Sequence, residues 1–382
     1  MGCIMVRQCH SNTCPVGVCV QDEALRKKFT GTPEKVINLM TFIAEEVREI
    51  LAKLGYRSLD EVIGRTELLR QVSRGAEHLD DLDLNPILAK VDAPDSARRF
   101  SIPTFRNEVP DSLDAQMIHD AKPVFERREK MQLTYNVRNT HRAVGTRFSS
   151  EITRLYGMKG LSEGHVHVRL RGSAGQSLGA FLCQGITLEV FGDANDYVGK
   201  GLSGGTIIVR PTVSSPLTSQ QNSIIGNTVL YGATSGRLLA AGQAGERFAV
   251  RNSGAHVVVE GCGSNGLEYM TGGMAVILGK VGSNFGAGMT GGMAFVLDTE
   301  GDFAKMANPD SIVWQRLDSA YWEDQLKSLI TAHAQATDSA WSQSLLEDWD
   351  RRRGEFWQIC PKEMLTRLSQ PLSDHEVLEA AE

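Results

Sequence analysis

The sequence predicts a mixed but mainly β protein: a parallel β-helix of about seven coils, preceded by an α-rich segment and followed by a helical tail. Three observations lead to this fold class. Glycine is concentrated in residues 160–302 and recurs there at nearly fixed intervals. An amphipathic pattern with a period of 3.6 residues comes before that region. Leucines recur at helical intervals after it, and all five tryptophans lie in that same last part of the chain.

The glycine-rich region is a repeat. One glycine precedes each short apolar segment, at positions Gly164, Gly185, Gly204, Gly236, Gly254, Gly273 and Gly292. A nearly fixed period of about 19 residues, with one strand-and-turn signal per unit, is typical of a solenoid. Glycine suits the sharp corners of each coil. An antiparallel β-sandwich is the alternative, but its turns would recur roughly every 8–12 residues.

Apolar residues alternate within each unit, as in a strand that buries one face. The alternating pairs are Leu188/Val190, Ile207/Val209, Val257/Val259, Val276/Leu278 and Phe295/Leu297. We expect all of them to fill the interior of the coils. The longest interval, from Gly204 to Gly236, contains residues 211–222, a Ser/Thr/Gln/Pro stretch that we interpret as a loop inserted in one repeat.

Residues 1–72 carry one strong helix signal. Thr32 can act as the N-cap and Pro33 suits the first helical position. Apolar residues then recur with a 3.6 period as far as Leu54, and Gly55 is a natural stop. The sequence therefore predicts a packing helix over residues 32–54.

A second, shorter helix is expected from Ser58 to about Gly64, with Glu61 completing a capping box. The polar, proline-containing stretch that follows reads as a connector. We predict that the tail is helical, with Leu317, Leu326, Leu329, Ile330, Leu345, Leu346, Trp349 and Phe356 at helical intervals. The predicted segments are 1–72, 73–128, 129–302 for the β-helix and 303–382 for the tail.

The N-terminal loop holds the strongest candidate site. Four of the seven cysteines lie in the first twenty residues, and Cys3, Cys9 and Cys14 have the spacing C-x5-C-x4-C. Three thiolates this close together suit one inorganic centre better than a disulfide framework. Pro15 follows Cys14 directly, as a proline follows the last cysteine of the bacterial ferredoxin motif.

Three interpretations of this loop remain open on spacing alone. The first is an iron–sulfur cluster with one iron corner missing, held by Cys3, Cys9 and Cys14. The second is structural zinc with Cys19 or His10 as fourth ligand, although the usual C-x2-C pairs are absent. The third is a set of buried thiols without a ligand.

Other motifs favour structural roles. The glycines of residues 172–179 and 192–199 match neither the dinucleotide nor the P-loop fingerprint, so we interpret them as turn glycines. His165 and His167 could bind a metal together, but no third ligand is near in sequence. We expect both histidines at the surface, and we assign no catalytic residue.

Composition excludes several function classes. A net charge of −6 gives no reason to expect a nucleic-acid partner. No apolar run reaches the roughly 18 residues of a membrane span. The start lacks the basic and apolar regions of a secretory signal, and an odd number of cysteines favours a reducing compartment. We therefore predict a cytoplasmic protein.

Four longer strings make the chain resemble a known family. They are Gly2-Cys-Ile-Met-Val-Arg-Gln-Cys-His-Ser-Asn-Thr-Cys-Pro-Val-Gly17, Asn139-Thr-His-Arg-Ala-Val-Gly-Thr-Arg147, Gly172-Ser-Ala-Gly-Gln-Ser-Leu-Gly-Ala-Phe181 and Gly192-Asp-Ala-Asn-Asp-Tyr-Val-Gly-Lys-Gly-Leu-Ser-Gly-Gly205. The chain resembles, essentially end to end, the C-terminal part of the large (alpha) subunit of glutamate synthase. The resemblance implies the end of an FMN-binding (β/α)8 barrel followed by a right-handed parallel β-helix.

The resemblance also implies a reaction. In that family a glutaminase domain releases ammonia, which adds to 2-oxoglutarate in the flavin barrel, and reduced FMN delivers hydride. A [3Fe–4S] cluster relays electrons to the FMN, and its ligands fall on Cys3, Cys9 and Cys14. Cys19 is an addition to the usual pattern, and we interpret it as a bystander. The implied partners are the upstream glutaminase and barrel part, and an NADPH-oxidising small subunit or ferredoxin.

The resemblance also indicates what this chain lacks. The glutaminase and most of the barrel are missing, including the FMN-phosphate loop expected just before Met1. The helix over residues 32–54 would then be a barrel helix without the strands that it should cover. We therefore expect the chain to be inactive on its own. The alternative is a noncatalytic structural or interaction β-solenoid, stapled by zinc.

Overall fold

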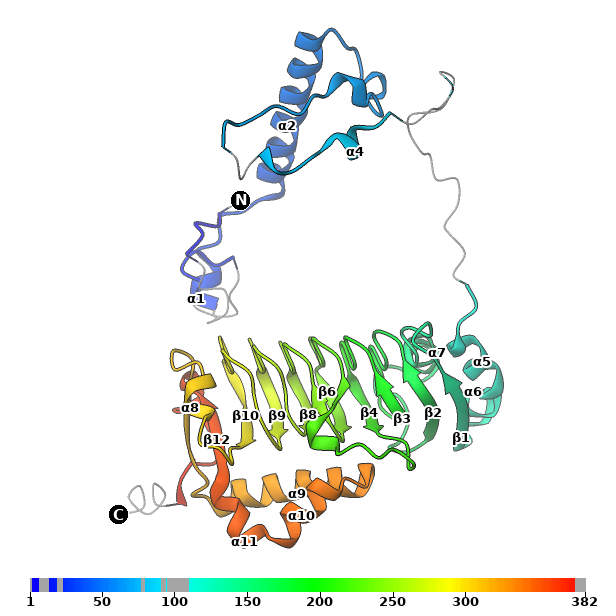
Figure 1. Cartoon of the computed structure of the whole chain (residues 1–382), viewed down its shortest axis with the longest axis vertical. Coiled ribbons are helices and arrows are strands. Elements are labelled where there is room, and N and C mark those ends of the chain that lie inside the picture. Colours follow the sequence, from blue (N-terminus) through cyan, green and yellow to red (C-terminus); the bar gives the residue numbers. More distant parts are fainter. Residues whose placement is uncertain are drawn as a thin grey trace. The chain divides into compact units, whose positions relative to one another are not determined.

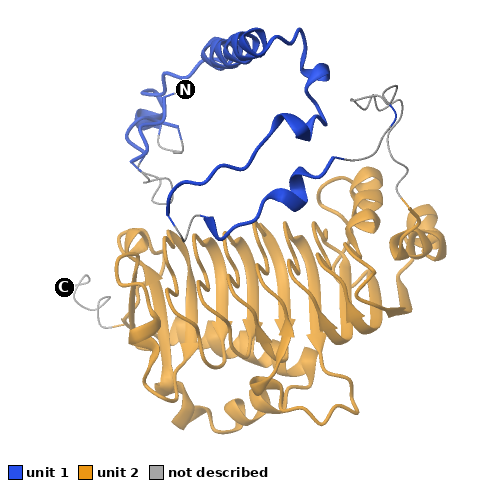
Figure 2. Cartoon of the chain, turned by 45° about the horizontal axis from the view of Figure 1, so that its top comes forward, with its two compact units in different colours: residues 1–109 blue, residues 110–382 orange. Residues whose placement is uncertain are grey.

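The computed structural model describes residues 2–6, 14–18, 23–76, 80–90, 94 and 110–374. The chain divides into two compact units, Met1–Val109 (unit 1) and Pro110–Glu382 (unit 2), as Figure 2 shows. Each unit is described by itself below. The predicted division at residues 72, 128 and 302 stays a prediction.

Unit 1 is built around one long helix, α2 (Pro33–Leu54). The Thr32 hydroxyl accepts a hydrogen bond from the backbone nitrogen of Lys35 at 3.4 Å, and Pro33 begins the helix. Gly55 ends it in the left-handed conformation with φ of 81°. The predicted helix and both of its caps are confirmed. The other described elements of unit 1 are α1 (Glu23–Arg26), η2 (Leu59–Glu61), η3 (Thr66–Leu68) and α4 (Asn85–Leu88).

The second predicted helix of unit 1 is wrong. The segment after Ser58 forms only a 3₁₀ turn, η2, and the Ser58 side chain makes no capping bond. Glu61 Oε2 instead accepts from the backbone nitrogen of Arg57 at 2.9 Å. Because the reciprocal bonds of a capping box are not formed, nothing extends this turn into an α-helix.

A twelve-stranded sheet forms the centre of unit 2, in the order β1-β2-β3-β4-β6-β8-β9-β10-β12-β11, with β5 pairing β3 and β7 (Figure 1). The strands are β1 (Met131–Val137), β2 (Val166–Ala174), β3 (Ile186–Ala194), β4 (Ser203–Arg210), β5 (Ser223–Ile225), β6 (Ser235–Ala240), β7 (Gln243–Ala244), β8 (Ser253–Val259), β9 (Thr271–Ile277), β10 (Gly291–Leu297), β11 (Ile312–Arg316) and β12 (Phe356–Pro361). The ladder from β1 to β10 is parallel, and only β12 pairs antiparallel with β10 and β11. The antiparallel sandwich is therefore wrong for this region.

The register of the sheet reproduces the sequence repeat. Leu188 pairs with Ile207 and Leu238 with Val257, so each strand meets the equivalent residue of the next unit. Between Ile207 and Leu238 the step is longer, because residues 211–222 form a loop between β4 and β5. The turns stack as well, since the Asn284 amide donates to Asn265 Oδ1 at 2.8 Å across one repeat. The repeat and its inserted loop are confirmed.

The two faces of the sheet bury different residues. Pairs such as Leu188/Val190 and Val257/Val259 lie in the larger core cluster. Val276/Leu278 and Phe295/Leu297 lie on the opposite face, in a second cluster, so their predicted inward orientation is wrong. In β9 and β10 both faces are buried, and the sequence there is continuously apolar. Alternation alone cannot tell which face points inward in such a strand.

The helical tail covers this second face. Helices α9 (Ala320–Thr337), α10 (Ala340–Glu347) and α11 (Trp349–Arg352) lie along one side of the strands in Figure 1. Trp322, Leu326 and Ile330 pack there. The predicted helical tail is confirmed for these elements, but Leu317 lies between β11 and α9 outside any helix, and Phe356 lies in β12. The remaining elements are α5 (Leu113–Asp120), α6 (Lys122–Arg127), α7 (Thr146–Tyr156), α8 (Phe303–Met306), η4 (Ser219–Gln221), η5 (Arg353–Glu355) and η6 (Lys362–Met364).

None of the helices in the described part of the chain is both long and apolar enough to cross a bilayer.

Candidate functional site

The cysteine loop of unit 1 is described at two of its three predicted ligands. Cys3 is exposed, and its Sγ accepts a hydrogen bond from the backbone nitrogen of Met5 at 3.4 Å. Hydrogen bonds to sulfur are among the contacts that tune iron–sulfur clusters. Cys9 lies outside the described residues, as do His10 and Cys19.

Cys14 lies in a tight turn that is packed against α1. Its side chain is buried, and its carbonyl oxygen accepts from the backbone nitrogen of Gly17 at 3.1 Å. Gly17 has φ of +76°, and a Cβ there would lie 2.5 Å from Leu25 O and 3.0 Å from the Phe29 nitrogen. Only glycine fits this turn, so the backbone that follows Cys14 is fixed in place.

These two cysteines fit an iron–sulfur cluster in the chemistry of their donor atoms. Both offer sulfur, one of them on a rigid turn and the other beside a backbone N–H group. In the described part of the chain, no group of three or more His, Cys, Asp or Glu side chains is arranged to hold a metal. Because Cys9 is not among the described residues, the triad of Cys3, Cys9 and Cys14 stays a prediction.

The cysteines of unit 2 have a different character. Cys183, Cys262 and Cys360 are all buried. Burial raises the pKa of Cys262 to about 12 and that of Cys360 to about 11, and it also raises the pKa of Cys183. Because the thiolate is the form that binds metals and attacks electrophiles, these three residues behave as packing side chains.

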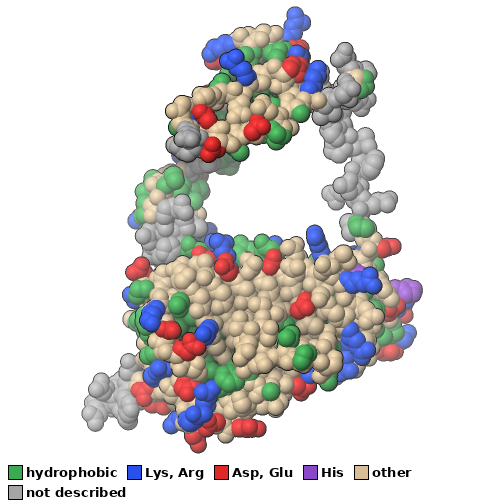
Figure 3. Space-filling view, viewed as in Figure 1, with side chains coloured by type: hydrophobic (Ala, Val, Ile, Leu, Met, Phe, Trp, Pro, Cys, Tyr) green, Lys and Arg blue, Asp and Glu red, His purple; other side chains and the backbone are tan. Residues whose placement is uncertain are grey.

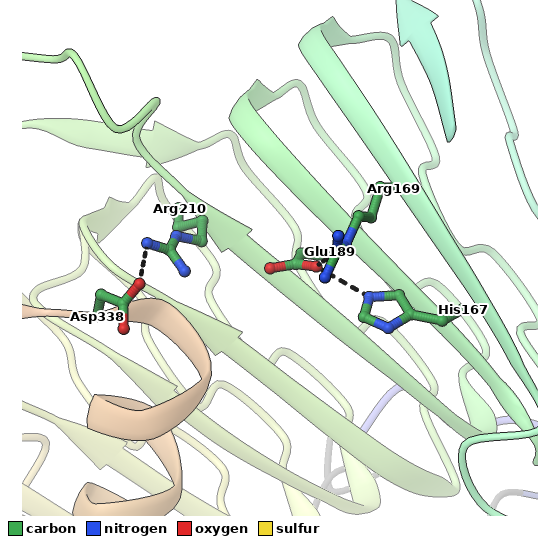
Figure 4. Close-up of polar contacts among 5 residues, drawn as sticks. All are labelled: His167, Arg169, Glu189, Arg210 and Asp338. Atoms are coloured by element: carbon green, nitrogen blue, oxygen red, sulfur yellow. Dashed lines mark hydrogen bonds and ion pairs between the residues drawn. The ribbon is translucent and has the colours of Figure 1, made fainter. Parts of the chain in front are cut away.

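A polar cluster lies on the strands of the sheet (Figure 4). Glu189 Oε2 contacts His167 Nε2 at 2.9 Å and Arg169 Nε at 3.2 Å. Arg210 pairs with Asp338 at the end of α9. These contacts join β2 to β3 and β4 to the helical tail.

The two histidines near the start of β2 differ in burial. His167 is partly exposed, but His165 is only 8% exposed, so its predicted surface position is wrong. Its Nδ1 lies 3.1 Å from Ser162 Oγ. His165 precedes the strand, which begins at Val166, and the alternation of faces within a strand does not extend to it.

The glycine motifs have structural roles. A Cβ on Gly192 would lie 2.1 Å from Gly172 O, and one on Gly172 would lie 2.3 Å from Val137 O. Each glycine therefore lets the backbone of one strand approach the backbone of the strand before it. This packing supports our interpretation that these glycines do not cradle a phosphate.

Sequence reasoning missed a buried polar network between the sheet and the tail. Ser339, the N-cap of α10, donates a hydrogen bond to Glu260 Oε1. His333 contacts Ser342 Oγ through Nδ1 at 2.7 Å and Ala240 O through Nε2 at 3.1 Å. These partners come from distant parts of the chain, and no local motif joins them.

Comparison with known proteins places both parts of the chain. Residues 114–362 match the family described as the GXGXG motif, and residues 1–57 match the conserved region in glutamate synthase. The first match covers more than half of the chain, so the chain belongs to the GXGXG-motif family. It corresponds to a C-terminal portion of glutamate synthase large chains, which confirms the resemblance.

Several relatives have high identity to this chain. The large chain of NADPH glutamate synthase from Azospirillum brasilense is 68% identical over 97% of this chain and 24% of its own length. Ferredoxin-dependent glutamate synthase 2 from Synechocystis sp. is 47% identical over 94% of this chain and 23% of its own. NADH glutamate synthase from Schizosaccharomyces pombe is 43% identical over 98% and 18%, respectively. The chain thus spans about a quarter or less of the length of the curated relatives it matches.

Proposed function

We propose that this chain is the electron-relay and structural portion of a glutamate synthase, an oxidoreductase. The observation that carries the proposal is the cysteine loop, which lies within the match to the conserved region in glutamate synthase. The fixed turn at Cys14 and the N–H···S contact at Cys3 support it. The whole enzyme would form glutamate reductively from 2-oxoglutarate and glutamine-derived ammonia.

Three thiolates of this chain, Cys3, Cys9 and Cys14, are the proposed ligands of a [3Fe–4S] cluster. When bound, the cluster supplies one-electron transfer to the FMN of the complete enzyme. The rigid turn at Gly17 holds Cys14 in position, and Met5 donates to the sulfur of Cys3. We place the protein in the cytoplasm, where a reducing environment keeps thiols available as ligands.

Unit 2 contains the proposed scaffold, a right-handed parallel β-helix over residues 129–302. Parallel strands paired from one repeat to the next, together with stacked turns, support this architecture. The handedness follows from the family resemblance. The scaffold's proposed role is to set the spacing of the other parts of the enzyme, and we assign no catalytic role to its described residues.

Unit 1 supports a close association with the upstream part of the enzyme. The apolar residues Val36, Met40 and Ile43 lie on one face of α2 and are 44%, 58% and 44% exposed. Apolar side chains are visible at the surface of this unit in Figure 3. We propose that the FMN-binding barrel of the same enzyme covers this face, because a monomer seldom exposes a large apolar patch. NADPH through a small subunit, or ferredoxin, is the proposed electron donor.

Anaerobic reconstitution of the full chain with iron and sulfide, followed by EPR of the oxidised protein, tests the proposal. We expect the signal of a three-iron cluster, and we expect Cys9→Ser or Cys14→Ser to abolish it. Cys19→Ser and Cys183→Ser are the matched controls and should retain the signal. A spectrum without any signal, together with stoichiometric bound zinc, would contradict the electron-relay role and favour the alternative, a noncatalytic β-solenoid stapled by zinc.

A further inference from the structure

A cavity of about 710 Å³ lies in unit 2 at the carboxyl ends of β8, β9 and β10. The residues that directly follow these strands line it, and Gln220 and Gln221 come from the loop inserted between β4 and β5. The loop inserted in the repeat therefore supplies part of the cavity wall. Volumes of roughly 300–1,000 Å³ are typical of small-molecule sites.

Glu260 lines this cavity and is fully buried. Its Oε1 accepts a hydrogen bond from Ser339 Oγ, which in turn accepts from the backbone nitrogen of Ser342 at 3.1 Å. Burial raises the pKa of Glu260, whereas the nearby hydroxyls of Ser219 and Ser339 lower it. Even so, Oε2 has no partner at hydrogen-bonding geometry among the described residues. A buried polar atom without a hydrogen-bond partner is unfavourable, and a donor group in the cavity would satisfy it.

The charges that line the cavity are mainly negative. Asp298, Glu300 and Asp302 lie with Glu260 in the wall, and among the described lining residues Lys280 is the one cation. Lys280 Nζ already pairs with Glu300 Oε1 at 2.8 Å. Asp298 is also engaged, because it accepts from the indole nitrogen of a neighbouring tryptophan and from backbone nitrogens that follow it. The group that fits Glu260 Oε2 is therefore a cationic donor.

The rest of the cavity wall is apolar. Trp341 is held in place by its indole nitrogen, which donates to Leu278 O at 2.7 Å. The other apolar lining residues are Leu278, Val281, Val296, Leu297, Phe303 and Met306. A ligand that fits such a wall has a hydrocarbon body beside its charged end.

We propose that this cavity binds a small primary amine with an apolar body, its ammonium donating to Glu260 Oε2 and its carbon chain packing against the partly exposed Val281 and Trp341. This site is separate from the cysteine loop and goes beyond the proposed electron relay.

Calorimetric titration of the full chain with n-pentylamine tests the proposal, with n-pentanol as the neutral comparator. We expect saturable binding of the amine and at least tenfold weaker binding of the alcohol. Glu260→Gln keeps the shape of the side chain and an acceptor for Ser339, and should weaken amine binding at least tenfold. Glu246→Gln, at an exposed position on another turn, is the matched control and should leave it unchanged.

A second variant keeps the test decisive if Glu260→Gln fails to fold, as judged by its circular dichroism and melting temperature. Met306→Trp fills the cavity without touching Glu260 and should abolish amine binding. Equal affinity for the amine and the alcohol, or undiminished amine binding in the folded Glu260→Gln variant, would overturn the proposal. So would the absence of saturable binding to the unmodified chain, which would leave Ser219 or an internal water as the partner of Oε2.

Discussion

The carboxyl group of Asp114 on α5 caps α7, because it accepts hydrogen bonds from the backbone nitrogens of Gly145 at 2.8 Å and Phe148 at 3.0 Å. Gly145 is the N-cap of α7 and has no side chain to do this itself. Burial, the largest effect, raises the pKa of Asp114, whereas these amide contacts lower it. The two helices close one end of the larger core, where Met117, Phe148 and Ile152 are fully buried.

Replacing Asp114 by Ala should lower the free energy of unfolding of unit 2 by about 1–3 kcal/mol, since buried amides lose their acceptor. Asn keeps one acceptor oxygen and should cost less. Urea unfolding followed by circular dichroism measures both effects. Asp111→Ala, at an exposed position just before α5, is the control and should change little. Equal losses for the two Ala variants would contradict the capping role.

His333 should make stability depend on pH in acid. Its buried ring is neutral, with Nε2 donating to Ala240 O and Nδ1 accepting from Ser342 Oγ, and burial lowers its pKa from 6.5 to about 4. Between those two values the unfolded chain binds a proton at His333 and the folded chain does not. The free energy of unfolding therefore falls as pH falls through this window, by on the order of 3 kcal/mol in all.

Melting temperatures and urea midpoints measured from pH 7 to pH 4 check this expectation. His333→Gln removes the titrating group and should flatten the slope in that window. His119→Gln, at an exposed position on α5, should leave the slope as it is. A slope that is unchanged in His333→Gln would assign the acid sensitivity to other groups.

Glycines at one position of successive repeats should not tolerate substitution by a residue that has a side chain. A Cβ on Gly254, Gly272 or Gly291 would lie 2.1, 2.3 or 2.1 Å from a backbone carbonyl oxygen of the preceding repeat. Gly272→Ala should therefore lower the free energy of unfolding by about 3 kcal/mol, at the upper end of overpacking. Gly354, which has open space around it, is the control: Gly354→Ala should be neutral or stabilising by up to ~1 kcal/mol. Chemical denaturation measures the free energy of unfolding of both variants. Similar losses for the two would contradict the close approach of backbones at Gly272.

Local signals in the sequence were sufficient for much of the fold. Thr32, Pro33 and Gly55 are each close in sequence to the backbone groups that they satisfy, so α2 and its caps could be predicted. The repeat could be predicted because each coil meets a near copy of itself one unit further along the chain. Ser58 and Glu61 show the limit of local reasoning, since the motif was present but the reciprocal bonds were not.

What depends on distant partners could not be predicted. Val276 and Phe295 face the helical tail because α9 covers that side of the sheet. The sequences of β9 and β10 do not indicate which of their two faces a helix covers. Phe356 follows helical residues at a helical interval, yet it lies in a strand because its backbone pairs with β10. The contact between Glu260 and Ser339 likewise joins distant parts of the sequence. In the candidate site, spacing indicated Cys3, Cys9 and Cys14 as ligands in one of three interpretations, and this assignment stays a prediction. The turn that follows Cys14 could not be predicted, because it depends on packing against α1.

The exposed face of α2 should make the isolated chain self-associate. Met40 is 58% exposed on this face, in a helix with no buried residues. Met40→Lys removes apolar surface and adds a charge, so it should shift the chain towards monomer in sedimentation velocity. Thr41→Lys adds the same charge beside it without removing a large apolar side chain, and should have a smaller effect. If both variants shift the distribution equally, charge and not the apolar face controls association.

The cysteines should differ in reactivity towards an alkylating reagent, and bound iron should change the reactivity of the loop cysteines only. Cys3 is exposed, whereas Cys183, Cys262 and Cys360 are buried thiols with raised pKa values. Iodoacetamide should therefore alkylate Cys3 in the native chain and reach the three buried cysteines only after denaturation. Reconstitution with iron and sulfide should protect Cys3, and removing the iron with a chelator should restore its labelling. Peptide mass spectrometry follows each residue separately, with Cys360 as the internal control. Labelling of Cys3 at the same rate with and without iron and sulfide would mean that this thiol is not a cluster ligand, whatever metal the rest of the chain retains.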